Sequence, residues 1–188
     1  FMSHGTHVVS VCDVDEARLK DAKARVDEQN ASKGLNIECI ATTKYEDIIA
    51  RDDIDAVCIA TPDHWHAIPT VAALRSGKDV YCEKPLTHNI FEAITVIDEV
   101  EKNDRVLQTG SMQRSSKEFR VACELVRNGV IGEIERVECD FGDPGVPCDL
   151  PEEEMEPGLD WERWLGPAPE RPYHSILSPR GIHNNFPR

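Results

Sequence analysis

Two spacings of apolar residues alternate along the first two-thirds of the chain. Short apolar runs typical of strands occur at His7–Cys12, Asn36–Ile40, Ile54–Ala60, Asp79–Cys82 and Arg105–Thr109. Segments with helical spacing of apolar residues lie between them, at Glu16–Gln29, Tyr45–Ala50, Trp65–Ser76 and Asn89–Glu101. This repeated strand–helix order predicts an α/β fold built on a parallel, doubly wound sheet.

Residues at the ends of these segments agree with the assignment. Asp15 stands in the N-cap position before the first helix, and Asn89 and Glu92 have the spacing of a capping box. Gly77 is placed to end the helix that begins near Trp65. The run Ile54–Ala60 is nearly all apolar, which predicts a strand covered on both faces.

The pattern changes after Ser115. We expect a helix over Ser116–Asn128 whose inward face carries Phe119, Ala122, Cys123 and Val126. Strict alternation over Ile134–Phe141 then predicts a strand of an antiparallel sheet with one wet face. We therefore divide the chain into a first domain, residues 1–115, and part of a second domain, residues 116–188.

Prolines and glycines dominate residues 142–188, where we expect only a short turn of helix near Trp161–Leu165. A stretch of 47 residues with little regular structure is uncommon in a complete domain. We expect this segment to pack against a part of the protein outside residues 1–188.

Composition narrows the class of partner. Hydrophobic residues make up 40% of the chain, which is enough for a core. Lysine and arginine total 21 against 35 acidic residues, so the formal net charge is −14. Nucleic-acid binding needs a cationic surface, so this balance argues against such a partner and favours small molecules. No apolar run approaches the ~18 residues that cross a bilayer, so we expect no membrane partner.

The seven cysteines include no Cys-x-x-Cys pair. They predict reduced, buried thiols in a cytoplasmic protein, with disulfides or a zinc site as the alternative. The chain begins Phe1-Met2-Ser3, so we expect the natural amino terminus to lie upstream, which leaves an export signal open.

Polar residues follow the predicted strands at their carboxyl ends, where open α/β sheets bind ligands. Asp13 ends the first strand, and an acid in this place typically binds the adenosine ribose of a dinucleotide. The alternative is that Asp13 opens the turn before Asp15. The glycine fingerprint of a dinucleotide site lies about 20 residues before that acid. Since only Gly5 precedes Asp13, we expect the first strand and the glycine turn to lie before Phe1.

A second polar segment, Thr61–His66, follows the apolar run Ile54–Ala60. Thr61 offers a hydroxyl, Pro62 stiffens the turn, and the amino terminus of the next helix favours anionic groups. The alternatives are a helix cap on the surface, or a metal pair of His64 and His66 that lacks a third ligand nearby.

Lys84, in Cys82-Glu83-Lys84-Pro85, is the best candidate for a residue that does chemistry. Beside a cationic nicotinamide ring the ammonium form of a lysine is disfavoured, because like charges repel. The amine could then take a proton from a substrate hydroxyl during hydride transfer. Pro85 would fix the direction of the lysine. The alternative is an exposed Glu–Lys pair before a proline turn.

Two further candidates lie later in the chain. Gln113 and Arg114 follow the last parallel strand and could bind sugar hydroxyls or a carboxylate, the alternative being a polar linker. Trp161 and Trp164 share one helical face. Indole rings suit sugars, but they also anchor loops to a core, and we favour anchoring.

In this order the motifs resemble the glucose–fructose oxidoreductase/inositol dehydrogenase (Gfo/Idh/MocA) family. The matching segments are VCDVD at 11–15, AVCIATPDHWHA at 56–67, VYCEKPLTHN at 80–89 and QTGSMQRS at 108–115. The run DWERWLGPAPERPYH at 160–174 is similar to one branch of the family. The resemblance implies a Rossmann dinucleotide-binding domain followed by an α/β domain with an open antiparallel sheet. It also implies NAD(P)-dependent oxidation or reduction of a sugar, polyol or related hydroxyl compound.

The resemblance implies a role for each candidate. The cofactor-binding residues would be Asp13, Thr61, Pro62, His66, Glu83, Lys84, Pro85, Gln113 and Arg114. The substrate contacts would be Lys84, Arg114 and Trp161, and Lys84 would be catalytic. We expect NAD rather than NADP, because the Asp13 carboxylate would repel a 2′-phosphate. Pairing of subunits into a homo-oligomer is expected from the same resemblance.

Two parts of the family pattern do not occur in residues 1–188. They are the glycine fingerprint and a later segment that carries an aspartate and a catalytic histidine. We therefore interpret the chain as an internal fragment that is inactive by itself. Two other functions stay open: a glycoside hydrolase that uses tightly held NAD transiently, and a non-catalytic nucleotide-binding protein.

Overall fold

The computed structural model describes residues 5–140 and 149–180. Five strands lie in the described residues: β1 (Ser10–Cys12), β2 (Ile40–Thr42), β3 (Ala56–Ile59), β4 (Asp79–Glu83) and β5 (Leu107–Gly110). The α-helices there are α1 (Glu16–Ser32), α2 (Tyr45–Ile49), α3 (Ala67–Arg75), α4 (Ile90–Asn103), α5 (Lys117–Arg127) and α6 (Trp161–Leu165). Two 3₁₀ helices, η1 (Asp63–Trp65) and η2 (Met112–Ser115), follow β3 and β5.

All the strand pairs in the described residues are parallel, as predicted. They form two sheets, β1–β2 and β3–β4–β5. No hydrogen-bonded pairing joins β1 to β3, so within the described residues each of these strands has one unpaired edge. The strand–helix alternation that the apolar pattern predicted is therefore present, in two sheets.

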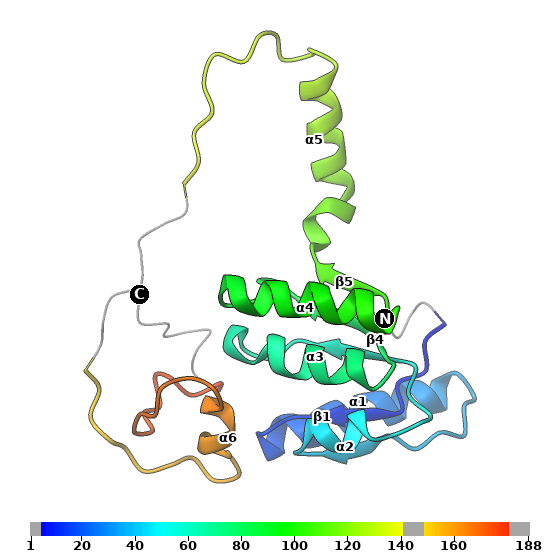
Figure 1. Ribbon diagram of the computed structural model, residues 1–188, viewed down its shortest axis with the longest axis vertical. Coiled ribbons are helices and arrows are strands. Elements are labelled where there is room, and N and C mark those ends of the chain that lie inside the picture. The colour runs from blue at the N-terminus through cyan, green and yellow to red at the C-terminus, as the bar shows by residue number, and fades with distance from the viewer. Residues whose placement is uncertain (1–4, 141–148, 181–188) are drawn as a thin grey trace.

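The main core lies between the three-stranded sheet and the helices α3 and α4, which run side by side over it (Figure 1). Its buried residues are Ile59, Ala73, Leu74, Val80, Cys82 and Val96. Arg75 of α3 binds Glu99 of α4 across 2.6 Å, and Glu99 is buried. We predicted that Ile54–Ala60 is covered on both faces, and this was wrong. Ala56 and Cys58 are exposed because no described helix packs on that face.

The predicted helix caps form. Asp15 Oδ1 accepts the amide of Ala17 at 2.9 Å, which satisfies a free donor in the first turn of α1. Asn89 Oδ1 accepts the amide of Glu92 at 2.9 Å, and the Glu92 carboxylate accepts the amide of His88. Gly77 follows α3 with a positive φ of 80°, a conformation that glycine adopts readily.

Lys78, at the start of β4, is buried with 4% of its surface exposed. Its ammonium group donates to the carbonyl oxygens of Arg51 at 2.5 Å and Ile54 at 3.0 Å. These carbonyls belong to the segment that links α2 to β3. Lys78 therefore joins that connection to the edge of the core.

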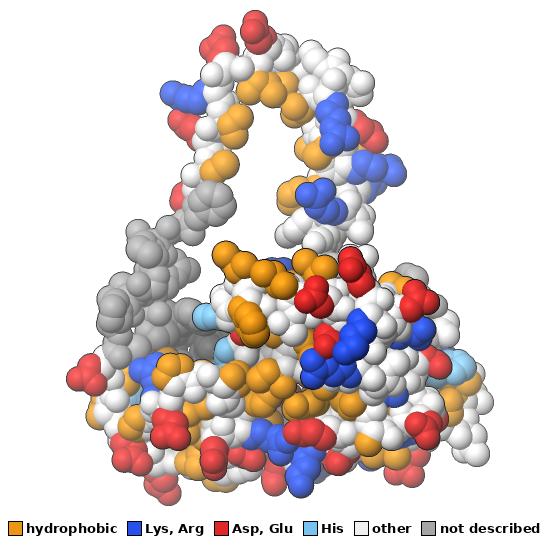
Figure 2. Space-filling view, in the orientation of Figure 1, with side chains coloured by type: hydrophobic (Ala, Val, Ile, Leu, Met, Phe, Trp, Pro, Cys, Tyr) orange, Lys and Arg blue, Asp and Glu red, His pale blue; other side chains and the backbone are white. Residues whose placement is uncertain are grey.

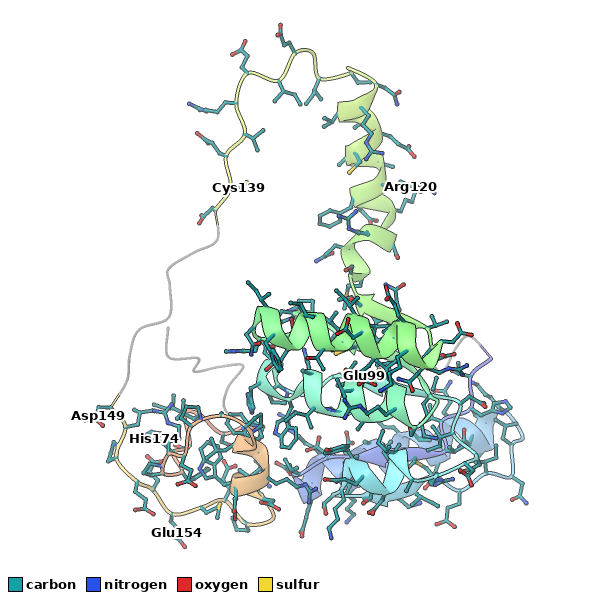
Figure 3. All side chains as sticks on the ribbon, in the orientation of Figure 1. Glu99, Arg120, Cys139, Asp149, Glu154 and His174 are labelled. Atoms are coloured by element: carbon teal, nitrogen blue, oxygen red, sulfur yellow. The ribbon has the colours of Figure 1, made fainter. Side chains whose placement is uncertain are left out.

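The segment after Ser115 departs from the predictions. The helix α5 forms where it was expected, but it projects away from the sheet and its inward-facing residues are exposed (Figure 1). Figure 3 shows Arg120 on this helix and Cys139 on the extended segment beyond it. Residues 134–140 form no strand, because no partner strand lies beside them to accept their backbone hydrogen bonds. Phe141, the last residue of that predicted strand, lies outside the described residues.

Apolar side chains also gather on the outer surface of α4 (Figure 2). Ile90 and Phe91 are about four-fifths exposed, and Ile94 and Ile97 are about half exposed. Adjacent turns of the helix thus present one apolar row. No described element covers this row.

Residues 157–180, here called the strap, pack back against the segment that follows β1. The predicted packing of this region against a part of the protein outside residues 1–188 stays a prediction. Leu159, Trp161, Leu165 and Tyr173 form a second buried cluster, with Val14 packed against it. Leu159 also forms an isolated antiparallel bridge with Asp15. The short helix predicted near Trp161–Leu165 is α6.

Six cysteines lie in the described residues, and all six are free thiols. Cys39 and Cys82 are buried, as predicted, whereas Cys12, Cys58, Cys123 and Cys139 are exposed. Cys148 lies outside the described residues. No helix in the described ranges has the length and apolar character needed to cross a membrane.

Candidate functional site

The sequence-predicted polar residues follow the strands at their carboxyl ends. Asp13 comes directly after β1, Thr61 two residues after β3, Lys84 directly after β4 and Gln113 three residues after β5. Parallel strands end at the same edge of a sheet, so the candidates after β3, β4 and β5 share one edge. This is the edge at which open α/β sheets bind ligands.

Lys84 is exposed at this edge, in the turn that leaves β4. Its backbone amide donates to the Glu83 carboxylate at 3.2 Å, and its peptide bond to Pro85 is cis. The described residues provide no ion pair to the Lys84 ammonium group. The amine is thus presented to solvent, where a substrate hydroxyl could reach it.

Glu83 is the last residue of β4 and lies beside the neighbouring strand β5. The register places it opposite Gly110 of β5, and a Cβ atom at position 110 would lie 2.6 Å from Glu83 Oε2. That separation is too short for two non-bonded heavy atoms. A side chain at position 110 would therefore require the end of the flexible Glu83 side chain to shift.

His66 lies behind this edge and is 1% exposed. Its Nδ1 is 2.5 Å from the carbonyl oxygen of Pro85, and its Nε2 is 2.8 Å from the carbonyl oxygen of Thr61. The ring therefore contacts two loops of the edge from the inside. Thr61 is exposed and Pro62 half-buried, so these two residues can line a bound molecule directly.

Asp13 is half-buried at the end of β1. Its Oδ1 accepts the amide of Asp15 at 2.9 Å. Burial raises the pKa of the Asp13 carboxyl, and the nearby Arg18 charge opposes this shift. A carboxylate held at a strand end in this way can accept hydrogen bonds from the hydroxyls of a ribose.

The remaining candidates differ in exposure. Gln113 and Arg114 lie in η2 with exposed side chains, close to the end of β5. Trp161 is 7% exposed, stacks on Trp164 with ring centroids 4.8 Å apart, and donates from its indole nitrogen to the carbonyl of Arg171. This packing supports the anchoring interpretation of Trp161 and leaves little of its surface for a substrate.

The strap contacts residues that follow β1 and residues that follow β3. The carbonyl oxygen of Trp164 lies 2.9 Å from His64 Nε2 and accepts the indole N–H of Trp65 at 3.0 Å. Arg163 binds both carboxylate oxygens of Glu46 in α2, at 2.7 and 2.8 Å. A pocket of about 340 Å³ lies between Trp65 and the strap, away from Lys84.

Sequence reasoning missed the strap contacts made by Arg163 and by Arg180. Arg180 binds Asp15, and the two residues are 165 positions apart, so no local spacing connects them. It also missed Gly110, whose role depends on the register of β4 against β5.

The two histidines of the His-x-His motif do not converge. His64 faces the strap, whereas His66 faces the turns after β3 and β4. Across residues 5–140 and 149–180, no group of three histidine, cysteine, aspartate or glutamate side chains comes together in an arrangement that could hold a metal ion.

Comparison with known proteins agrees with this geometry. Residues 2–111 match the family described as "Oxidoreductase family, NAD-binding Rossmann fold" (GFO_IDH_MocA). The chain belongs to this family. The residues that follow β1, β3 and β4 offer groups that suit a dinucleotide chemically: the carboxylate of Asp13, the hydroxyl of Thr61 and the amine of Lys84.

Curated relatives in the family carry two kinds of name. An inositol 2-dehydrogenase of Corynebacterium glutamicum is 34% identical over 131 residues, which are 69% of this chain and 36% of that protein. A glycosyl hydrolase family 109 protein of Shewanella sp. is 29% identical over 130 residues, which are 69% of this chain and 28% of that protein. The chain thus spans about a third of the length of these relatives.

Solved structures in the family match a similar share. A myo-inositol 2-dehydrogenase from Lactobacillus plantarum has a TM-score of 0.57 at 30% identity, covering 70% of this chain and 36% of that one. A scyllo-inositol dehydrogenase from Lactobacillus casei, with bound NAD(H) and scyllo-inositol, has a TM-score of 0.53 at 28% identity, covering 67% and 34%. A 3-ketoreductase from Actinomadura kijaniata, in complex with TDP-benzene and NADP, has a TM-score of 0.56 at 28% identity, covering 68% and 36%.

Proposed function

We propose that the full-length protein is an NAD-dependent oxidoreductase that acts on a sugar, a polyol or a related hydroxyl compound by hydride transfer. The observation that carries this proposal is the position of Lys84, whose exposed amine follows β4 at the ligand-binding edge of the sheet. The inositol dehydrogenases among the relatives support the substrate class. A small-molecule substrate also suits a chain with a formal net charge of −14.

The residues at the edge suggest a role for each side chain in hydride and proton transfer. When bound, the nicotinamide would accept a hydride from the substrate carbon. Lys84 would take the proton from the hydroxyl on that carbon, so a carbonyl forms. Glu83 and Pro85 would set the direction of the Lys84 main chain. Gln113 and Arg114, in the turn after β5, would bind hydroxyls of the substrate or the nicotinamide amide.

Asp13 supports NAD rather than NADP as the cofactor. Its carboxylate follows β1, where it would bind the adenosine ribose, and it would repel a 2′-phosphate. The relatives include an NAD(H) complex and an NADP complex, so the proposal needs its own test. In a titration of the full-length protein, NAD should bind more tightly than NADP, and Asp13→Asn should narrow the difference. Tighter binding of NADP would contradict the proposed preference.

The activity can be tested on the full-length protein with a panel of sugars and polyols, by the absorbance of NADH. We expect NADH formation with at least one substrate and a large loss of kcat in Lys84→Ala. Lys102→Ala, on the exposed end of α4, is the matched control and should keep the activity. Absence of NADH with every substrate, or an unaffected Lys84→Ala variant, would refute the proposal.

A second candidate function is glycoside hydrolysis with transient use of NAD, favoured by the glycosyl hydrolase family 109 names among the relatives. In that reaction the substrate is oxidised by NAD, loses its aglycone by elimination, adds water to the resulting double bond and is reduced again by the NADH formed in the first step. Product analysis separates the two functions. Release of an aglycone without net NADH would favour the hydrolase.

A further inference from the structure

His66 has two main-chain acceptors on its two ring nitrogens. The distance from Nδ1 to the Pro85 carbonyl oxygen is 2.5 Å, and that from Nε2 to the Thr61 carbonyl oxygen is 2.8 Å. A carbonyl oxygen accepts hydrogen bonds and cannot donate one. A ring N–H can donate to either oxygen, and the ring lies within hydrogen-bond distance of both.

The two carbonyls belong to different loops of the candidate site. Thr61 lies in the loop after β3, and Pro85 lies in the turn after β4, directly after Lys84. The strands β3 and β4 are paired neighbours, with Ile59 opposite Cys82. The imidazole thus spans the two loops just beyond the point where their strands stop pairing.

The ring is mounted on a rigid support. His66 directly precedes α3, and its own carbonyl accepts the amide of Thr70 at 3.4 Å. Ala67 and Thr70 in the first turn of α3 are buried, as is the His66 ring at 1% exposure. The ring therefore has little freedom to move away from either carbonyl. The position of the Pro85 carbonyl is set relative to the helix and, through it, to the core.

We propose that His66 is a positioning residue, whose buried ring holds the Lys84 turn against the Thr61 loop. This inference rests on the proposed function of Lys84 in proton transfer. It also replaces the sequence-based role of His66 as a residue that lines the cofactor. The buried His66 ring does not reach the open side of the edge. His66 therefore acts on Lys84 through the backbone of the turn that contains both Lys84 and Pro85.

A double-mutant cycle in the full-length protein tests the positioning role. His66→Phe keeps a ring of similar shape but removes both ring nitrogens. We expect it to lower kcat by about 10- to 100-fold, the scale of loss when a catalytic group is displaced by ~1 Å. NAD affinity should change by less than about threefold, because the cofactor does not touch the ring. In the Lys84→Ala background the same substitution should lower kcat by less than about twofold.

Equal losses in both backgrounds would overturn the proposal, since they would show a general structural effect. His66→Gln retains an amide donor, so it should recover part of the kcat lost in His66→Phe. It also serves in the cycle if His66→Phe does not fold. His88→Phe, which changes an exposed histidine just beyond the turn, is the matched control and should keep kcat within about twofold.

A measurement without turnover tests the contact itself. In protein labelled with nitrogen-15 at histidine, NMR of the His66 ring should show a ring N–H that exchanges slowly with water, unlike that of the exposed His88. Exchange as fast as that of His88 would overturn the buried contact. If no sugar or polyol is oxidised, the proposed function fails, while this spectrum still decides whether His66 joins the two loops.

Discussion

Arg180 forms a two-pronged ion pair with Asp15, 165 positions earlier in the chain. Its Nε lies 2.5 Å from Asp15 Oδ2 and its Nη2 lies 3.1 Å from Oδ1, while Asp15 is fully buried. Asp15 Oδ1 also accepts the amide of Ala17 as the N-cap of α1. The Asp15 carboxylate thus caps α1 and also binds Arg180 of the strap.

Replacing Arg180 should therefore weaken both the N-cap of α1 and the attachment of the strap. Arg180→Met leaves a buried carboxylate without its main partner, and we expect the free energy of unfolding to fall by about 1.5–3 kcal/mol at neutral pH. Arg127→Met, at the end of the exposed helix α5, should change it by less than about 0.5 kcal/mol. Urea unfolding measures both variants. Equal stability of Arg180→Met and the original protein would show that the strap does not depend on this pair.

The same pair predicts a pH dependence. The pKa of the Asp15 carboxyl is lower than usual, and the largest cause is the hydrogen bond that Arg180 donates to it. A lowered folded-state pKa contributes stability above the unfolded-state pKa, and this stability is lost as the pH falls through the folded-state value. The difference in unfolding free energy between the original protein and Asp15→Asn should thus shrink on acidification below the ordinary aspartate range. A difference that stays constant with pH would contradict this assignment.

Asp13 should behave in the opposite way. Burial raises its pKa, so the folded state favours the protonated form and ionisation at neutral pH costs stability. Asp13→Asn keeps an oxygen for the amide of Asp15, so we expect a higher Tm at pH 7 and a smaller gain at acidic pH. The same variant should bind NAD more weakly in the full-length protein. A lower Tm at pH 7 would contradict the prediction.

Lys78 offers a test of the core without touching the candidate site. Lys78→Met fills similar space but leaves the carbonyls of Arg51 and Ile54 without the ammonium donor. We expect a loss of about 1–3 kcal/mol in the free energy of unfolding, because these acceptors lie in a buried connection. Lys102→Met, an exposed change on α4, is the control. Chemical denaturation should separate the two variants clearly.

The chain alone should bind NAD poorly. The phosphates of a dinucleotide are held by a glycine-rich turn at the start of a helix, and residues 1–188 contain no such fingerprint. Calorimetry on residues 1–188 should detect no micromolar binding of NAD. Micromolar affinity would refute this expectation.

The apolar pattern predicted the parallel strands and helices of residues 5–115 well, because local burial and local caps decide them. Asp15 and Asn89 cap helices within three residues, so their roles are visible in the sequence. The segment after Ser115 was harder to predict. A strand over residues 134–140 requires a partner, and the described residues contain none.

The residues of the candidate site also divide into those that the local sequence predicts and those that depend on distant contacts. Lys84 and Asp13 were identified because each follows a strand directly. The interior position of His66 could not be predicted, since it depends on how far the turn after β4 folds back over α3. The contact of Arg163 with Glu46 joins segments 117 positions apart, and no pattern in either segment predicts this contact.

The close approach of Glu83 to Gly110 has a consequence for variation between related proteins. A side chain at position 110 would meet the end of the Glu83 side chain, so that carboxylate would have to move. The same carboxylate accepts the backbone amide of Lys84, so its movement would change a contact in the turn that carries Lys84. We therefore expect homologues with a larger residue at position 110 to have a shorter or differently placed side chain at position 83.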